Sequence, residues 1–92
     1  MNIIKKRIES LFKELGFDEV TINGNRLYEL SGAYYKITYI EEHKSFVIEY
    51  AESYYEALKN IFWDGDWYPI SLDEDGLLIK LRSDLEKFYI SK

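Results

Sequence analysis

The chain has 92 residues, a formal net charge of −5 and no cysteine. This length suits one domain, and a hydrophobic content of 47% separates the chain from disordered acidic tails. Without cysteine, disulfides, thiol nucleophiles and thiolate metal sites are excluded. No apolar run approaches the ~20 residues that span a bilayer, and the N-terminus lacks the apolar stretch of a signal peptide. We therefore expect a cytoplasmic protein with no membrane partner.

The first predicted element is an amphipathic helix over residues 3–15. Its apolar side chains recur at helical spacing and share one face: Ile4, Ile8, Leu11, Phe12 and Leu15. Gly16 is placed to end this helix in a left-handed conformation, and Phe17 can then fold back onto the last turn.

Strand signals follow, over residues 27–30, 34–40 and 46–50. Asn23-Gly24 and Ser31-Gly32 supply the turn chemistry between the early segments. Short connections predict an antiparallel meander of three main strands. Residues 20–22 are a possible fourth strand, and the pattern leaves open whether they join the sheet.

Two more helices are predicted in the second half of the chain. Ser53 and Glu56 fit a capping box for a helix over about 54–62, with Tyr54, Leu58 and Ile61 as its buried stripe. Residues 63–71 are predicted to form a loop because Gly65 and Pro69 interrupt them. The last helix begins after Asp73 as N-cap, with an apolar face that comprises Leu77, Leu78, Leu81, Leu85 and Phe88. The predicted fold is α+β, in the order α-β-β-β-α-α, with a three- to four-stranded antiparallel sheet and helices packed on one face.

Charge is distributed unevenly along the chain. Residues 1–40 carry six basic and five acidic side chains, whereas residues 41–76 carry ten acidic side chains against Lys44 and Lys59, a balance of −8. Such a field disfavours direct nucleic-acid binding and attracts a basic protein surface. The alternative is that the excess only keeps the protein soluble.

The segment Phe62-Trp63-Asp64-Gly65-Asp66-Trp67-Tyr68-Pro69 carries both tryptophans of the chain. Core aromatics usually recur at helix or strand spacing, whereas these flank two aspartates and a glycine. Aromatic anchors beside carboxylates suit a surface that binds a basic protein. A simple turn-forming role for the aspartates is the alternative.

The sequence shows no catalytic constellation. A calcium loop that starts at Asp64 fails because Tyr68 and Pro69 occupy its fifth and sixth positions. His43 is the only histidine, in a predicted turn, and no serine lies in a nucleophile motif. Asp73, Glu74 and Asp75 are also explained as favourable charge at a helix N-terminus. We expect no enzyme activity, no metal and no cofactor.

From Tyr50 to the end, the chain resembles the C-terminal part of small immunity proteins of bacterial polymorphic-toxin systems, of Firmicutes type. The resemblance comprises Glu56-Ala57 in a helix, the 62–69 segment, an acidic turn, and a final helix with Asp84-Leu85 and Tyr89. It implies a cytosolic protein that binds and blocks a cognate toxin domain. In element order and charge sign alone, the chain is similar to small acidic anti-CRISPR proteins, which mimic DNA.

The sequence therefore predicts a non-catalytic inhibitor that binds a basic protein partner, such as a toxin or nuclease. The alternatives are a DNA mimic from a mobile element and a structural domain that forms a homodimer. The predicted partner-binding residues are Trp63, Asp64, Asp66, Trp67, Tyr68, Asp73, Glu74, Asp75, Glu41 and Glu42.

Overall fold

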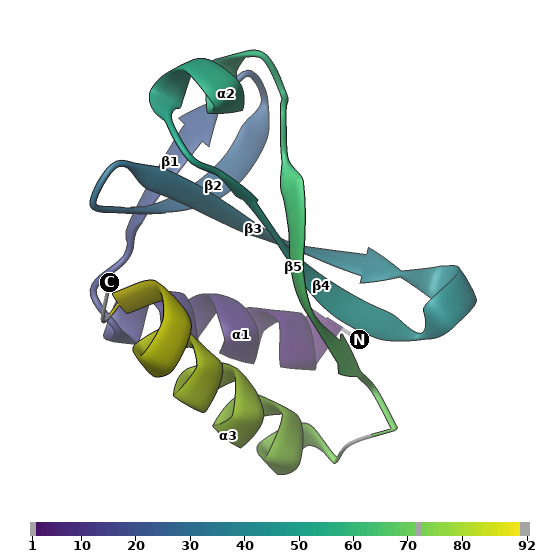
Figure 1. Ribbon diagram of the computed structural model, residues 1–92. Coiled ribbons are helices and arrows are strands. Elements are labelled where there is room, and N and C mark those ends of the chain that lie inside the picture. Colours follow the sequence, from purple (N-terminus) through teal and green to yellow (C-terminus); the bar gives the residue numbers. More distant parts are fainter. Residues whose placement is uncertain (1, 72, 91–92) are drawn as a thin grey trace.

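The strands of this protein form one antiparallel sheet in the order β1-β2-β3-β4-β5 (Figure 1). The computed structural model describes residues 2–71 and 73–90. In chain order, its elements are α1 (Asn2–Glu14), β1 (Asp18–Ile22), β2 (Asn25–Leu30), β3 (Ala33–Ile40), η1 (Glu41–His43), β4 (Ser45–Ala51), α2 (Tyr54–Leu58), β5 (Trp63–Pro69), α3 (Glu74–Asp84) and η2 (Leu85–Ile90). Here η1 is a short 3₁₀-helix and η2 is a π-helical turn that continues α3. The predicted α+β class is confirmed. The sheet has five strands where the sequence predicted three or four.

Helix α1 ends at Gly16, as the sequence predicts. Gly16 has a φ of 97°, a conformation that glycine adopts without steric cost. Its amide donates to the Lys13 carbonyl at 3.1 Å, and the Phe17 amide donates to the Phe12 carbonyl at 3.0 Å. The Phe12 and Phe17 rings meet edge to face with centroids 4.9 Å apart. This Schellman motif sets the direction in which the chain enters β1.

Two tight turns join the first three strands. Asn23 and Gly24 both have positive φ, as do Ser31 and Gly32, which is the type I′ geometry that matches strand twist. Residues 20–22 belong to β1, which pairs with β2 from Asp18↔Glu29 to Ile22↔Asn25. The sequence had left open whether these residues join the sheet, and the structure places them in it.

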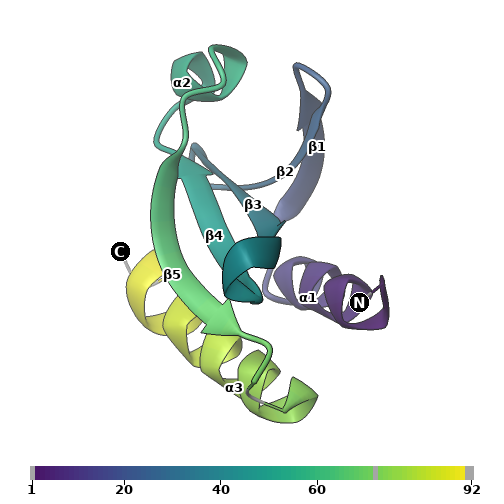
Figure 2. The same cartoon turned by 90° about the vertical axis from the view of Figure 1, so that its right-hand side faces the viewer.

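Side chains alternate along each strand, so the sheet has two faces, and each face carries a cluster of buried apolar residues. Helices α1 and α3 cover one face and bury the main core there (Figure 2). We call the opposite face the outer face. It carries a smaller cluster of buried residues beneath α2: Ile22, Leu27, Ala51 and Ala57. The prediction that the helices pack on one face is therefore wrong for α2.

Helix α2 has five residues and is shorter than predicted. Ser53 is its N-cap as predicted, since the Ser53 hydroxyl accepts from the Glu56 amide at 3.2 Å. The Glu56 carboxylate accepts from the amide of Glu52, the residue before the N-cap, at 2.8 Å, whereas in the predicted capping box it would accept from Ser53. The helix stops because Asn60 adopts a φ of 60° and the Ile61 amide returns to the Glu56 carbonyl at 2.8 Å. This is the asparagine form of the motif that ends α1.

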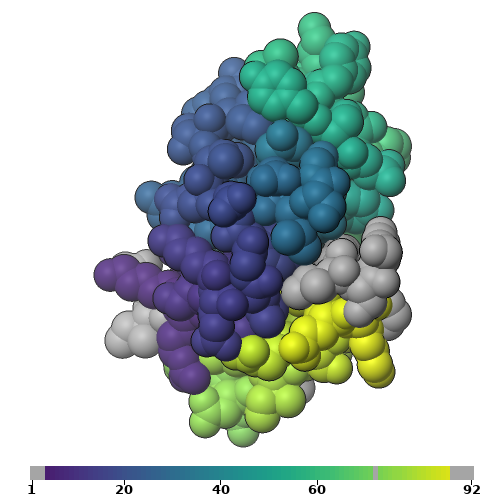
Figure 3. Space-filling view, turned by 90° about the vertical axis from the view of Figure 1, so that its left-hand side faces the viewer, coloured from purple at the N-terminus to yellow at the C-terminus, as the bar shows by residue number. Residues whose placement is uncertain are grey.

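The tip of the β1–β2 hairpin holds α2 in place (Figure 3). The Asn23 side-chain amide donates to the Leu58 backbone carbonyl at 3.2 Å, and the Asn25 side-chain amide donates to the Asn60 side-chain oxygen at 3.0 Å. These bonds join two segments that are more than thirty residues apart in sequence. They fix the position of the surface that α2 presents.

Helix α3 begins after Asp73, as predicted, and buries Leu77 and Leu81. Leu85, the first residue of η2, is also fully buried. The side chain of Phe88, predicted on the same face, lies outside the described part of the chain. No helix among the described residues combines the length and apolar character that a membrane-spanning segment requires.

Candidate protein-binding surface

The segment Trp63–Pro69 forms strand β5, so the predicted loop over residues 63–71 is wrong for residues 63–69; residues 70–71 form a turn. β5 pairs antiparallel with β4, from Tyr50↔Trp63 to Ser45↔Pro69. The aromatic residues of the segment have high strand propensity, and this outweighs the turn signals of Gly65 and Pro69. Pro69 occupies the last position of an edge strand, where proline is tolerated.

A β-bulge at Gly65 and Asp66 separates the two tryptophans onto different faces. Glu49 lies opposite Asp64 and Val47 opposite Trp67, so two steps along β4 match three steps along β5. One extra residue reverses which face each later side chain takes. Trp67 therefore shares the outer face with Val47, while Trp63 shares the other face with Tyr50. The single aromatic patch that the sequence suggested is divided between the two faces of the sheet.

Trp63 is 51% exposed and lies at the α2 end of β5. Its indole N–H donates to a carboxylate oxygen of Glu56 at 3.3 Å. The same Glu56 oxygen accepts the Glu52 amide at 2.8 Å, so one carboxylate joins the start of α2 to the Trp63 ring. An exposed tryptophan held in one position is a suitable anchor for a partner, since less side-chain entropy is lost on binding.

Trp67 is 40% exposed and lies toward the opposite end of β5. Its ring meets the His43 ring edge to face with centroids 5.3 Å apart. His43 belongs to η1, which also carries the exposed Glu41 and Glu42. The structure therefore brings these two predicted residues near Trp67.

Tyr68 is a correction to the predicted site. It is fully buried, with 0% exposure, because the residue after Trp67 points to the face that α3 covers. Its hydroxyl donates to the Asp84 carboxylate at 2.9 Å, and the Lys80 ammonium lies 4.9 Å from its ring centroid. Tyr68 therefore joins β5 to α3 and cannot contact a partner in this fold.

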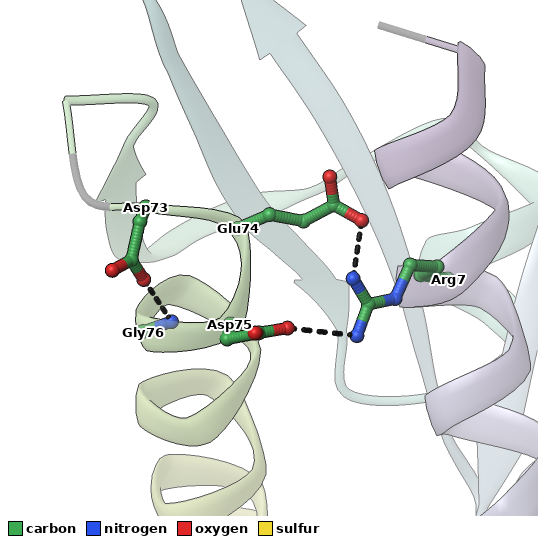
Figure 4. Close-up of polar contacts among 5 residues, drawn as sticks. All are labelled: Arg7, Asp73, Glu74, Asp75 and Gly76. Atoms are coloured by element: carbon green, nitrogen blue, oxygen red, sulfur yellow. Dashed lines mark hydrogen bonds and ion pairs between the residues drawn. The ribbon is translucent and has the colours of Figure 1, made fainter.

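The acidic group at the start of α3 is engaged within the protein (Figure 4). Asp73 accepts the Gly76 amide as the helix N-cap. Arg7 of α1 pairs with Glu74 and with Asp75, the latter at 3.1 Å. These hydrogen bonds hold the pKa of Arg7 above its ordinary value. Asp73, Glu74 and Asp75 stabilise the α1–α3 side of the molecule, away from α2 and the outer face.

Sequence reasoning missed the exposed side chains of α2 and of the segment that follows it. Ala57 is buried, whereas the side chains predicted as the buried stripe are exposed: Tyr54, Leu58 and Ile61. Tyr55 is exposed as well, at 64%. A five-residue helix has one short buried face, and Ala57 fills it. Asn60, a residue that tolerates left-handed φ, was the signal for this early stop.

The acidic residues 41–76 do not form one continuous patch, because Asp73, Glu74 and Asp75 lie on the α1–α3 side of the molecule. Glu41 and Glu42 precede β4, and Glu52 and Glu56 follow it. A strand of this length spans roughly 20 Å, more than twice the Debye length of ~8 Å at physiological salt. The two groups therefore act separately at that salt concentration.

Between these groups, two acidic residues face each other across the outer face of the sheet. Glu49 of β4 and Asp64 of β5 are directly opposite in the register, and such side chains lie about 5 Å apart at Cβ. The Thr38 hydroxyl donates to Glu49, and Asp64 is exposed. Lys36, opposite Glu49 on β3, places its ammonium 4.2 Å from the Phe62 ring centroid. Like charges in this position destabilise a sheet.

We use the name β5–α2 surface for the β5 edge of the sheet together with the adjoining α2. It comprises the outer-face pair Glu49 and Asp64 and the exposed aromatic and aliphatic residues along this edge: Tyr54, Tyr55, Leu58, Ile61, Trp63 and Trp67. Trp67 lies on the outer face of the edge and Trp63 on the other face. Carboxylates with apolar neighbours can bind ammonium and guanidinium groups. In the described residues, no three His, Asp or Glu side chains gather as a metal site. Comparison with known proteins gave no matching family model, no matching curated protein and no matching solved structure.

Proposed function

We propose that this protein binds a basic region of another protein on the β5–α2 surface, without catalysis. The observation that carries the proposal is the pair Glu49 and Asp64, opposite each other between exposed aromatic residues. A lysine or arginine of a partner would lie between the two carboxylates and relieve their repulsion. The gain would exceed that of an ordinary surface ion pair because the free protein starts from an unfavourable arrangement.

The aromatic residues supply the second part of the proposed interface. Trp63 and Trp67 are half exposed, and each contacts a neighbour that restricts its ring, Glu56 and His43 respectively. Tryptophan and tyrosine dominate binding energy where they become desolvated. In this arrangement the aromatic side chains provide affinity, whereas the carboxylates speed association and select a basic partner.

An immunity-type role is the specific form of this proposal. The C-terminal resemblance supports it, with a toxin domain as the basic partner and the cytoplasm as the place of action. A homodimer is the second candidate, because exposed apolar side chains on α2 also suit contact with another copy.

The test compares two charge reversals at equivalent positions in the sheet. Asp64→Lys changes the β5–α2 surface. Asp18→Lys makes the same change at the other edge of the sheet, where Asp18 lies opposite Glu29. Each tagged protein, with the wild type, is incubated with lysate of the source cells at low and moderate salt, crosslinked, and analysed by mass spectrometry.

We expect a basic protein that crosslinks to wild type and to Asp18→Lys, and that Asp64→Lys fails to capture. Its capture by the wild type should weaken as salt rises, since exposed charges are screened. Equal capture by all three proteins would show that the surface lies elsewhere. Crosslinks only between copies of the chain would favour the homodimer.

A further inference from the structure

Strand β5 is an outer edge of the sheet. Among the strands that the structure describes, it pairs with β4 alone, and Figure 2 shows it at the margin of the sheet. An edge strand has backbone N–H and C=O groups that point away from the sheet at alternate residues. These groups are a template on which a partner can add a strand.

The register identifies which residues of β5 point their backbone outward. The Ile70 amide donates to the Lys44 carbonyl at 2.9 Å, so this pair is of the hydrogen-bonded type. Antiparallel pairs alternate in type, which makes Ser45↔Pro69 and Val47↔Trp67 pairs of the other type. The backbone groups of Trp67 and Pro69 therefore point away from β4. Pro69, which has no N–H, fits this assignment.

The same alternation holds on the far side of the bulge. Along β4, Phe46, Ile48 and Tyr50 direct their backbone groups toward β5, so Tyr50↔Trp63 is a hydrogen-bonded pair and Glu49↔Asp64 is not. Asp64 therefore also points its N–H and C=O outward. The two bulge residues between Asp64 and Trp67 lie opposite Ile48. Asp64 and Trp67 therefore present outward backbone groups that are about as far apart as those of alternate residues in a regular strand.

This receptive part of the edge is short. At one end, Pro69 offers a carbonyl but no donor. At the other end, the chain leaves the strand at Trp63 and turns back to α2. A partner strand can therefore form ladder hydrogen bonds with Asp64 and Trp67, while its side chains reach the tryptophans and Glu49 on either face.

The side chains along this edge indicate the chemistry of the added strand. Asp64 and Asp66 lie on the edge, and Glu49 lies behind Asp64. A second copy of β5 would bring four aspartates into a ladder a few residues long, between chains that each carry −5. Opposite charges across neighbouring strands are favourable, and like charges are unfavourable. The charge complementarity therefore favours a strand rich in lysine or arginine.

We propose that the partner docks by adding a basic extended strand to the free edge of β5, hydrogen-bonded to the backbone of Asp64 and Trp67. This inference rests on the proposed function and specifies its binding mode. It also explains why the acidic residues and the tryptophans occur within one strand. The strand supplies the backbone template, the carboxylates select a basic segment, and the tryptophans lie on either side of it.

The test uses a short capped peptide in which lysine alternates with threonine, added to ¹⁵N-labelled protein at concentrations up to millimolar. Two peptides serve as controls. One has glutamate in place of lysine, and the other keeps every lysine but is N-methylated at its central residues, which removes backbone donors. Amide shifts and amide exchange with solvent are followed by NMR. Because ladder bonds and charge do not depend on a particular sequence, the proposal requires this probe to bind.

We expect the lysine peptide to shift the amide signals of Asp64 and Trp67 and to slow their exchange with solvent. Neither control peptide should do so. Asp64→Asn keeps the outward N–H and should weaken binding, whereas Asp64→Pro lacks that N–H and should abolish it. If Asp64→Pro is unfolded, the N-methylated peptide decides between charge and backbone pairing.

Three results would overturn the proposal. They are no binding of the lysine peptide, equal binding of its N-methylated form, and concentration-dependent broadening at β5 without peptide, which would mean that a second copy occupies the edge. If strand pairing fails but Asp64→Lys still abolishes capture of a basic protein, the proposed function stands and only its binding mode is wrong.

Discussion

Asp64 is the residue at which local stability and the proposed function oppose each other. Its side chain lies directly opposite Glu49 of the neighbouring strand β4. A neutral or basic residue would be more favourable in this position. Natural sequences break such local rules mainly at functional sites. The chain offers a comparison, because Asp18 and Glu29 form a second acidic pair at the far edge of the sheet, without the two tryptophans.

We predict that Asp64→Lys stabilises the folded protein. Replacing a like-charge pair by an opposite-charge pair should raise the free energy of unfolding by about 0.5–1 kcal/mol at low salt, and the gain should shrink at high salt. Urea unfolding measures it. Asp18→Lys should give a similar gain but leave partner capture intact. A loss of stability in Asp64→Lys would contradict the repulsion on which the proposed function depends.

Tyr28 makes the free energy of unfolding depend on pH in the alkaline range. Burial raises its pKa to about 12, and the carboxylates of Glu9 and Glu19 add to the shift. Its buried hydroxyl has no well-placed hydrogen-bond partner within the described residues, and the nearby Arg26 guanidinium, by its charge and a weak polar contact, opposes the rise in the pKa of Tyr28. The folded state therefore holds this tyrosine neutral at a pH where an unfolded chain would ionise it.

The sign of the effect follows from the raised pKa. The stability that the neutral hydroxyl contributes is complete below pH ~10, the ordinary tyrosine pKa, and is lost as the pH rises through about 12. We expect Tyr28→Phe to flatten the alkaline fall in unfolding free energy. At neutral pH it should leave stability unchanged or raise it, because it removes a buried hydroxyl that lacks a well-placed partner. Tyr55→Phe, which removes an exposed hydroxyl, is the control, and an equal effect of both substitutions would contradict the assignment.

Among single residues, the sequence did not show which side chains of β5 are buried. Trp63, Trp67 and Tyr68 are neighbours in sequence with similar strand propensity, yet Tyr68 is buried and the tryptophans are exposed. The bulge decides which residue points inward, and its position depends on pairing with β4. The sequence of β5 alone does not contain that register.

At the scale of elements, the ends of helices were predictable where the signal lies in neighbouring residues. The Gly16 end of α1 and the N-caps Ser53 and Asp73 are confirmed. The predicted length of α2 was wrong, because Asn60 adopts the left-handed conformation that glycine usually takes at the end of a helix. The location of α2 on the outer face depends on distant contacts with Asn23 and Asn25, which no local pattern shows.

In the first turn of α3, the helix cap at Asp73 and the residue at position 76 are expected to affect each other's contribution to stability. Asp73 caps the helix by accepting the Gly76 amide, and a Cβ at position 76 would lie 2.8 Å from the capping oxygen. Asp73→Ala should cost about 1 kcal/mol. Gly76→Ala should gain up to about 1 kcal/mol from helix propensity but lose part of the cap, so that its net effect in the wild type is small.

A double-mutant cycle measures this coupling. We expect Gly76→Ala to stabilise the Asp73→Ala protein by more than it stabilises the wild type, with a difference of about 0.5–1 kcal/mol in urea unfolding. Additive effects of the two substitutions would show that the alanine methyl fits beside an intact cap.

At the scale of the whole molecule, the sheet has two free edges and must avoid pairing with itself. β5 is the longer edge strand, and it combines the devices that natural proteins use against edge pairing: charged side chains, a bulge and a proline. Charge is the one device of the three that a basic partner can overcome. The same residues can therefore keep copies of the chain apart and still admit a basic strand.

This argument predicts that removing the charge on β5 permits self-association. The wild type should sediment as a monomer at physiological salt, and Asp64→Asn combined with Asp66→Asn should sediment at increasing apparent mass as its concentration rises. The control is Glu41→Gln with Glu42→Gln, which changes net charge equally but lies in η1, outside β5. If both double variants associate, net charge alone keeps the chains apart. If neither does, the bulge and Pro69 suffice to close the edge to a second copy, and the aspartates are left with partner selection as their role.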